Sequence, residues 1–271
     1  MGVETLHTQQ KGSLVVVGTG LTLAGHLSAE ARRVIIEADI VLALMGDRVV
    51  EAWLRTLNPR LERLEDQYEA ASSRPRAYRA MSERMLELVR SGLAVVVALY
   101  GHPGVFVTPS HEAIARARAE GFNAVMLPAI SAEDCLFADL GVDPGASGCQ
   151  SYEARDFFAH ARAFDPSAAL ILWQIAVLGD GAFRDFAPRP GALAALALVL
   201  LDVYPPAHRV AVYAGARLPT ERPRIDWLKL EDLHLAEIDQ SSTLYVPPLR
   251  EPSPSPSRLA LLESMLSAAE R

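Results

Sequence analysis

Cysteine is scarce in this sequence, and its scarcity excludes two classes of protein. The chain has 271 residues but two cysteines. Cys135 and Cys149 belong to no CxxC pair and have no histidine set nearby, so the sequence predicts neither a disulfide framework nor a zinc site. We interpret both as ordinary packed or loop thiols, and we expect no metal ion.

Long hydrophobic runs are missing as well. The longest apolar run, residues 192–201, has about half the length that crosses a bilayer. The N-terminal stretch MGVETLHTQQKG lacks the apolar core that export signals carry. We therefore expect an unexported, cytoplasmic protein that does not bind a membrane.

The sequence also has no excess of basic residues. Its formal net charge is −7 and its isoelectric point is near 5.5. A protein that binds a phosphate backbone needs a clustered surplus of lysine and arginine. Nucleic acid is therefore not an expected partner.

What the sequence does have is a series of short apolar runs separated by helical patterns. Half of the residues are hydrophobic, which is enough for a substantial core in one large or two ordinary domains. Each run is continuous rather than alternating, which is typical of strands covered on both faces in α/β proteins. The predicted strands are 13–18, 39–45, 93–100, 122–128, 169–177, 208–215 and 242–248.

Serines mark the expected helix starts between these runs. Ser28, Ser110 and Ser131 each precede a helical pattern, where a hydroxyl can accept hydrogen bonds from the first-turn N–H groups, and Gly121 predicts a helix end. The turn-rich stretch 141–148 favours a domain boundary near 128–150. We expect two α/β lobes followed by a Pro/Ser linker and a short tail: 12–128, 129–250 and 251–271.

Two glycine-rich stretches follow predicted strands. The first, VVVGTGL at 15–21, lacks the glycine spacing of the dinucleotide fingerprint, so a tight turn and a ligand role stay equally open. The second, LYGHPGVF at 99–106, places Gly101 and Gly104 at the carboxyl end of a strand, where open α/β sheets bind ligands. We therefore favour the second loop as the binding site.

The arginine-rich segment 66–84 has two interpretations. Most such runs are solvated helix faces. Arg74 and Tyr78, however, are four residues apart, so they share a face if a helix begins near Arg74. A guanidinium beside a phenol favours the phenolate, which a general base requires.

These motifs together resemble the tetrapyrrole-methylase superfamily, and within it most closely the borosin peptide α-N-methyltransferases. The resemblance is carried by LVVVGTGL, YGHPGVF, PAISAEDCL and SSTLYVPP, and it covers nearly all of residues 12–248. It implies an α/β, two-lobed class III methyltransferase fold with the cofactor in the cleft between the lobes. His102 stands where tetrapyrrole enzymes usually carry an acidic residue, which favours the peptide branch.

The resemblance also implies a catalytic set and a cofactor site. In the catalytic set Tyr78 is the general base, Arg74 assists it, Tyr68 positions the amide, and Tyr100 contacts both peptide and cofactor. The cofactor is S-adenosylmethionine and the product S-adenosylhomocysteine, with no metal. The implied cofactor residues are Tyr100, His102, Val105, Phe106, Ser131, Ala132, Gln174, Tyr213, Ser242 and Thr243. For Ala132 and Tyr213 an ordinary core role is an equally good interpretation.

The implied substrate is the backbone amide of a ribosomally made peptide. Fused borosins continue into their own core peptide, whereas this sequence ends soon after REPSPSPS, so we expect the split type with a separate precursor peptide. The implied assembly is a homodimer, or a heterotetramer with two precursors. A tetrapyrrole (precorrin or uroporphyrinogen) C-methyltransferase stays the alternative, because Arg74, Arg76 and Arg79 could line a basic cleft. A non-catalytic peptide-binding scaffold is a third interpretation.

Overall fold

The computed structural model describes residues 12–70, 74–180 and 189–269, without the side chains of residues 68–70 and 74. Its described residues form two compact units. The first unit holds residues 12–142, 180 and 213–225, and the second holds residues 143–179, 189–212 and 226–269. The expected division into lobes 12–128 and 129–250 stays a prediction about independently folding domains.

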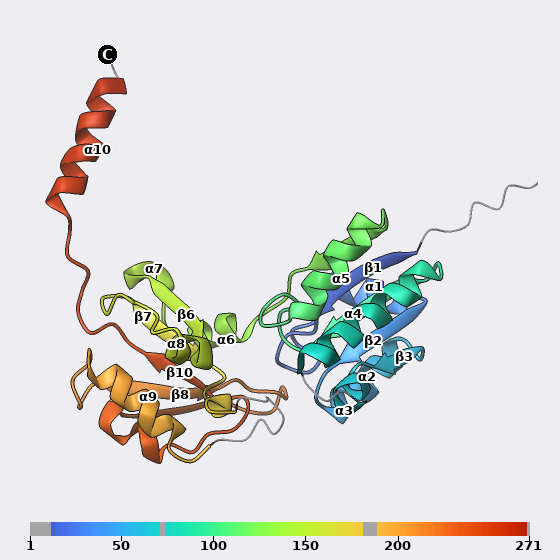
Figure 1. Ribbon diagram of the computed structural model, residues 1–271, viewed down its shortest axis with the longest axis horizontal. Coiled ribbons are helices and arrows are strands. Elements are labelled where there is room, and N and C mark those ends of the chain that lie inside the picture. The colour runs from blue at the N-terminus through green and yellow to red at the C-terminus, as the bar shows by residue number, and fades with distance from the viewer. Residues whose placement is uncertain (1–11, 71–73, 181–188, 270–271) are drawn as a thin grey trace, which may run out of the picture. The chain divides into compact units, whose positions relative to one another are not determined.

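The first unit contains a parallel sheet in the order β3-β2-β4-β1-β5 (Figure 1). Its strands are β1 Ser13–Gly18, β2 Ile40–Leu44, β3 Leu61–Arg63, β4 Ala94–Leu99 and β5 Asn123–Leu127. Ser13 of β1 lies opposite Ala94 of β4 on one side and Asn123 of β5 on the other. The continuous apolar runs therefore form central parallel strands, as the sequence predicts.

Helices cover both faces of this sheet. They are α1 Ala29–Glu37, α2 Arg48–Leu57, α4 Arg74–Arg90 and α5 Thr108–Ala119. Two further helices of this unit are α3 Glu65–Ala70, which contacts α4, and α6 Ala132–Leu140, which follows β5. Leu14 of β1 belongs to the same buried cluster as Met81 of α4 and Ile114 of α5. The side chains of Val17 and Ile35, from β1 and α1, belong to a separate cluster. Successive strand residues thus fill a core on each face, which makes the first unit a three-layer α/β/α structure.

The serine-capped helix starts are partly confirmed. The hydroxyl of Ser28 accepts from the N–H of Ala31 at the start of α1, and Ser131 caps α6. The expectation for Ser110 is wrong, because α5 begins two residues earlier at Thr108, where Pro109 favours the first turn. Ser110 is buried inside α5 instead.

The second unit is built on a mixed sheet in the order β6-β7-β10-β8-β9. Its elements are β6 Cys149–Glu153, β7 Ala169–Trp173, β8 Arg209–Ala214, β9 Arg224–Lys229, β10 Thr243–Val246, the helices α7 Pro144–Ser147, α8 Ala154–Ala159, α9 Ala192–Leu201 and α10 Pro256–Ala269, and the 3₁₀ turns Ile175–Val177 and Leu230–Leu235. β6 pairs with β7 in parallel, and β10 pairs with β7 antiparallel. The predicted strand 169–177 is therefore too long, because β7 ends at Trp173 and the chain turns at Gln174.

Two apolar helices of the second unit differ in burial. α9 places Leu196 and Leu200 in the core, while Leu198 on its other face is 67% exposed. α10 exposes its apolar side chains, among them Leu261 and Leu262. Among the helices of the described ranges, none combines the length and the apolar character that a membrane span requires.

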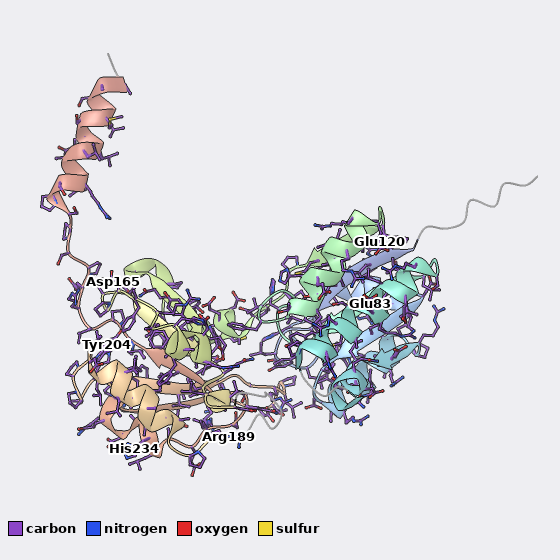
Figure 2. All side chains as sticks on the ribbon, viewed as in Figure 1. Glu83, Glu120, Asp165, Arg189, Tyr204 and His234 are labelled. Carbon is purple, nitrogen blue, oxygen red and sulfur yellow. The ribbon has the colours of Figure 1, made fainter. Side chains whose placement is uncertain are left out.

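The arginine-rich segment partly forms a solvated, ion-paired face. Arg84 of α4 donates to Glu62 at 2.7 Å, and Arg116 of α5 pairs with Glu83 at 2.7 Å. Figure 2 labels Glu83 on α4, the helix that packs beside α5. Exposed ion pairs of this kind each contribute little to stability, so they explain several arginines without a functional role.

Candidate functional site

The two glycine-rich loops of the first unit follow β1 and β4, two neighbouring strands whose onward connections run in opposite directions along the sheet. β1 lies between β4 and β5, and the chain leaves β1 over one face through α1 but leaves β4 over the other face through α5. The carboxyl ends of β1 and β4 therefore flank a topological switch point. Open α/β sheets bind their ligands at such a point.

The backbone itself joins the two loops. The N–H of Gly20 donates to the carbonyl of Gly101 at 3.2 Å, and the N–H of Gly101 donates back to Gly20 at 3.0 Å. A Cβ on Gly18 would overlap the Gly101 carbonyl oxygen, so this position requires glycine for close packing. A Cβ on Gly101 would contact one atom within 4 Å, Cδ1 of Leu21 at 3.9 Å, so a small group fits over this glycine beside that side chain.

Four hydrogen bonds fix the loop that follows β4. Nδ1 of His102 accepts from the N–H of Gly104 at 3.0 Å. The hydroxyl of Ser110 donates to the carbonyl of Pro103 at 2.7 Å, and Nε2 of His111 donates to the carbonyl of Gly104 at 2.8 Å. A fourth bond joins the N–H of Val105 to the carbonyl of His102. The loop is therefore tied to α5, and His102 uses one ring nitrogen inside the loop.

The same loop presents an apolar and aromatic surface. Tyr100, Val105 and Phe106 are 38%, 45% and 43% exposed. Phe106 has a φ of +56°, a left-handed conformation that costs of order 1–3 kcal/mol in a bulky residue. Strain of this kind gathers at ligand clamps, so it supports a binding role for this surface.

Ser131 and Ala132 lie at the start of α6, after the strand next to β1. The hydroxyl of Ser131 accepts from the N–H of Asp134, and the N–H of Ser131 donates to the Asp134 carboxylate at 2.7 Å, which completes a capping box. The hydroxyl also donates to that carboxylate at 2.6 Å. Burial raises the pKa of Asp134, but the hydrogen bonds from Ser131 outweigh it, so that pKa lies below its usual range. Ser131 thus has a structural role and keeps one lone pair for a further donor.

Tyr213 has a defined structural contact. Its buried hydroxyl donates to a carboxylate oxygen of Asp139 at 2.8 Å. Burial and this hydrogen bond both raise the pKa of Tyr213 far above its usual value, so the phenol stays protonated. This contact explains Tyr213 as a structural residue, and its cofactor role stays a prediction.

The structure also brings two charged residues to Tyr100 that the sequence did not indicate. Nη2 of Arg217 lies 3.4 Å from a carboxylate oxygen of Asp47. Burial raises the pKa of Tyr100, the Arg217 guanidinium lowers it, and Cys135 and Asp47 raise it, with a net increase. The sequence gives only a weak signal for Arg217, because either arginine of the stretch GARLPTERP, Arg217 or Arg222, resembles a solvated loop residue.

The remaining catalytic candidates lie on α3 and α4. α4 extends from Arg74, so the condition for Arg74 and Tyr78 to share a helix face is met. The helix returns the chain to the amino end of β4, so its first turn lies toward the carboxyl edge of the sheet. Tyr78 is half-buried and packs against the core cluster of the α4 face. The side chains of Tyr68 and Arg74 lie outside the described part of the chain.

Three expected cofactor residues belong to the second unit and share one end of its sheet. Gln174 follows β7 with a φ of +57°. The register pairs Leu172 of β7 with Leu244 of β10, so two residues further along Gln174 lies opposite Ser242. Ser242 and Thr243 are buried, and the Ser242 hydroxyl accepts from the N–H of Asp239 at 2.9 Å.

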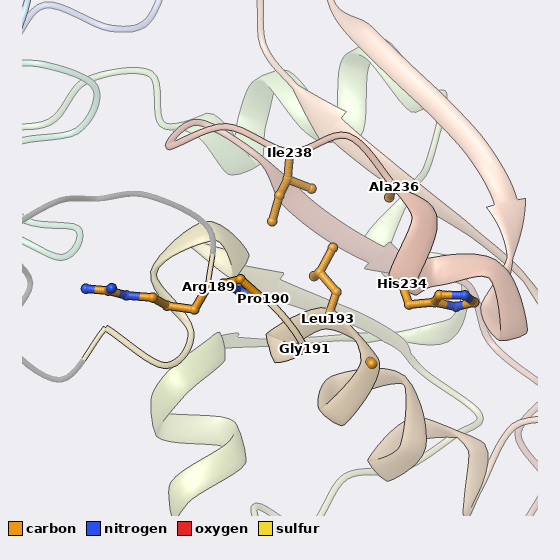
Figure 3. Close-up of a pocket in the computed structure, with 8 residues that line it drawn as sticks. Arg189, Pro190, Gly191, Leu193, His234, Ala236 and Ile238 are labelled. Carbon is orange, nitrogen blue, oxygen red and sulfur yellow. The ribbon is translucent and has the colours of Figure 1, made fainter.

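The second unit also contains a groove of about 480 Å³ (Figure 3). Leu193 and Ile238 point toward each other across it, and Arg189 and His234 extend outward (Figure 3). The predicted site residues are not among those that line this groove. Within the described ranges, no group of three His, Cys, Asp or Glu side chains could hold a metal ion.

Comparison with solved structures identifies the class of fold. A uroporphyrin-III-C-methyltransferase from Thermus thermophilus matches with a TM-score of 0.63 and 23% identity, over 88% of this chain and 93% of that chain. A cobalt precorrin-4 methyltransferase matches with a TM-score of 0.63 and 15% identity, over 89% and 96%. The two-unit α/β fold is therefore that of the tetrapyrrole methylases, as predicted.

The family follows from the sequence comparison. The model of the tetrapyrrole (corrin/porphyrin) methylases matches residues 13–229, and the chain belongs to this family. It is 40% identical over 94% of its length to a methyltransferase/ribosomally synthesized cyclic peptide dendrothelin A precursor of Dendrothele bispora, covering 63% of that protein.

Further curated relatives are of the same kind. The chain is 39% identical, over 88% of its length, to a methyltransferase/ribosomally synthesized type I borosin cyclic peptide precursor of Coprinopsis marcescibilis, of which it covers 62%. It is also 39% identical, over 91% of its length, to a methyltransferase/ribosomally synthesized cyclic peptide omphalotin A precursor of Omphalotus olearius, of which it covers 60%. The chain thus spans about three fifths of the length of these relatives, and the resemblance to borosin methyltransferases is confirmed.

Proposed function

We propose that this protein transfers a methyl group from S-adenosylmethionine to backbone amide nitrogens of a ribosomally made precursor peptide. The observation that carries this proposal is the 40% identity, over 94% of the chain, to a protein whose name joins a methyltransferase to a cyclic peptide precursor. A tetrapyrrole acceptor is less favoured, because the two solved tetrapyrrole enzymes described above share 23% and 15% identity with this chain.

The carboxyl edge of the first unit fits the proposed cofactor. The space over Gly101 admits a group that a Cβ would exclude, and Val105 and Phe106 offer an apolar surface for an adenine ring. Ser131 keeps a lone pair for a ribose hydroxyl. When bound, the cofactor supplies a methyl group activated by its sulfonium sulfur.

The acceptor nitrogen has to be activated by the protein. An amide nitrogen gives its lone pair to the carbonyl, which makes it planar and a poor nucleophile. Removal of the N–H proton leaves an imidate whose charge lies largely on oxygen. The nitrogen of this imidate then forms a bond to the methyl carbon while the bond between that carbon and sulfur breaks.

The residue roles follow from this chemistry. Tyr78 takes the amide proton as general base, and Arg74 stabilises the phenolate and the imidate oxygen. Tyr68 positions the amide, and Tyr100 at the end of β4 contacts the peptide and the sulfur end of the donor. Alignment of nitrogen and methyl supplies several kcal/mol of the barrier reduction.

The substrate arrangement is tested with an intact-mass experiment. The full chain is incubated with S-adenosylmethionine and a candidate precursor peptide, and in parallel with uroporphyrinogen, and the masses of the chain and of both acceptors are measured. We expect the separate precursor to gain mass in steps of one methyl group, located on backbone nitrogens by fragmentation. Methylation of this chain itself would overturn the separate precursor, and methylation of uroporphyrinogen in place of the peptide would overturn the proposed function.

The proposed assembly is a homodimer, with a heterotetramer containing two precursors as the alternative. The molar mass of the full chain, measured with and without the precursor, distinguishes the two. A monomer in both samples would contradict this part of the proposal.

A further inference from the structure

The loop after β8 contains Arg217, and its backbone contacts the turn that follows β1. The hydroxyl of Thr22 donates to the carbonyl of Ala216 at 3.2 Å. The N–H of Leu23 donates to the carbonyl of Arg217 at 2.9 Å. Two hydrogen bonds therefore tie the carbonyl groups of Ala216 and Arg217 to the residues that follow the first glycine-rich loop.

A buried leucine places the same loop beside the β4 end. A Cβ built on Gly101 would lie 3.9 Å from Cδ1 of Leu21, and one built on Gly215 would lie 2.7 Å from Cδ2 of Leu21. The Leu21 side chain thus lies between these two glycines. Gly215 and its neighbours are therefore close to Gly101 and to the residue before it, Tyr100.

Asp47, which lies between β2 and α2, forms an ion pair with the guanidinium of Arg217. One carboxylate oxygen accepts from the N–H of Val49 at 2.7 Å and so caps α2, while the other lies 3.4 Å from the Arg217 guanidinium. The N–H of Tyr100 donates to the carbonyl of Leu44, three residues before Asp47. The carboxylate is thus anchored by a helix cap beside the strand end that carries Tyr100.

The charges around Tyr100 oppose one another. Asp47, before α2, and Cys135, on α6, disfavour its phenolate, as does partial burial. The phenol of Tyr213, on β8, also interacts with Tyr100. Arg217 acts in the opposite direction and favours negative charge on the Tyr100 oxygen.

We propose that Arg217 is a positioning residue for Tyr100. Its guanidinium is held by Asp47, and its backbone is held by the 22–23 turn. In this position the guanidinium fixes the direction of the Tyr100 hydroxyl and stabilises negative charge on its oxygen. The functional consequence rests on the proposed function, in which Tyr100 contacts the peptide and the donor. Arg217 acts through Tyr100 and needs no contact with either.

The test places a fluorinated tyrosine at position 100 of the full chain. A difluorotyrosine titrates near neutral pH, and its ¹⁹F signal reports the proton on this one oxygen without substrate or cofactor. Loss of a cation raises the pKa of a nearby phenol, so Arg217→Gln should raise the midpoint of the ¹⁹F titration at position 100. We expect a shift that corresponds to at least about a threefold gain in the proton affinity of this phenol. Arg217→Lys should restore most of the change, and Arg222→Gln, on the same loop, is the matched control for net charge.

A double-mutant cycle tests the part played by Asp47. Asp47→Asn keeps an oxygen for the cap of α2 but removes the charge that holds the guanidinium. We expect Arg217→Gln to shift the midpoint of the ¹⁹F titration in the Asp47→Asn background by less than half of its shift in the wild-type background. An equal shift in both backgrounds would overturn the holding role of Asp47, and a shift no larger than that of Arg222→Gln would overturn the proposal.

Kinetics with the precursor separate this proposal from the proposed function. Arg217→Gln should lower kcat with little change in the KM of the peptide, and Arg217→Lys should rescue it. A protein that shows the ¹⁹F shifts but methylates no peptide keeps the proposal for Arg217 and loses the proposed function. A protein that methylates the peptide but shows no such ¹⁹F shifts keeps the proposed function and loses the proposal for Arg217.

Discussion

Gly20 and Gly101 exchange two backbone hydrogen bonds, of 3.2 and 3.0 Å, across the ends of β1 and β4. Both residues have positive φ angles, of +69° each, which glycine adopts at little cost. The exchange joins the two glycine-rich loops into one backbone platform. A Cβ on Gly101 would lie 3.9 Å from Cδ1 of Leu21, so the space over this glycine is bounded by a residue of the first loop.

A side-chain methyl group added at Gly101 should weaken cofactor binding, whereas one added at an exposed glycine elsewhere should not. Gly101→Ala should weaken the binding of S-adenosylhomocysteine at least about tenfold, because its Cβ would occupy the open space. Gly141→Ala is the matched control, since Gly141 has a φ of +67° with no atom within 4 Å of a Cβ. Both variants should lose roughly 1 kcal/mol of stability through backbone strain.

Calorimetric titration and thermal melts of the two glycine variants provide the readouts. Equal affinity of both variants for S-adenosylhomocysteine would show that the space over Gly101 is not part of the cofactor site.

A second prediction separates the capping role of Ser131 from its cofactor role. Ser28 and Ser131 both cap helices with their hydroxyl groups. Substitution of either by alanine should cost about 1 kcal/mol of stability. Ser131→Ala alone should also weaken S-adenosylhomocysteine binding by roughly threefold to tenfold, measured by calorimetry. Equal binding by both variants would reduce Ser131 to a helix cap.

The cap of Ser131 also has a pH signature. Its hydrogen bonds hold the pKa of Asp134 below the usual 3.8. A carboxyl whose pKa is lowered by folding stabilises the protein above its unfolded pKa and loses this effect as the pH falls. The stability difference between wild type and Ser131→Ala, followed by chemical unfolding, should therefore shrink as the pH falls below about 4. A difference that grows under acid would contradict this assignment.

Cys135 provides a prediction about reactivity. Burial first, and then the carboxylates of Asp139 and Asp134, raise the pKa of this thiol to about 11 from 9.0. In a Cys149→Ser variant at pH 8, Cys135 should react with iodoacetamide at least about tenfold more slowly than a free cysteine, because the thiolate is the nucleophile. Asp139→Asn should raise the rate. A wild-type rate equal to that of the urea-unfolded chain would be inconsistent with these surroundings.

Much of the fold could be predicted from the sequence because its central strands are continuous apolar runs. β1, β2, β4 and β8 each lie within a predicted run. The short strands β3, β6 and β9 were missed, since three residues or a polar stretch such as CQSYE have no apolar pattern. Their pairing depends on neighbouring strands that already exist in the sheet.

The site could be predicted less completely. The loop 99–106 was found because glycine, proline and aromatic residues follow a buried strand. Arg217 and Asp47 were not found, because they meet only after the loop behind β8 returns to the first unit. A contact between residues 170 positions apart leaves no local pattern in the sequence.

The central claim is that Tyr78 removes the amide proton, and Tyr78→Phe tests it most directly. The precursor's methylation rate is followed by intact mass, and S-adenosylhomocysteine affinity is measured on the same samples, with Tyr152→Phe in the second unit as control. We predict that Tyr78→Phe lowers the rate at least about a hundredfold and leaves the affinity within roughly twofold, because a general base contributes to the chemical step. Methylation at the wild-type rate by Tyr78→Phe would contradict the account.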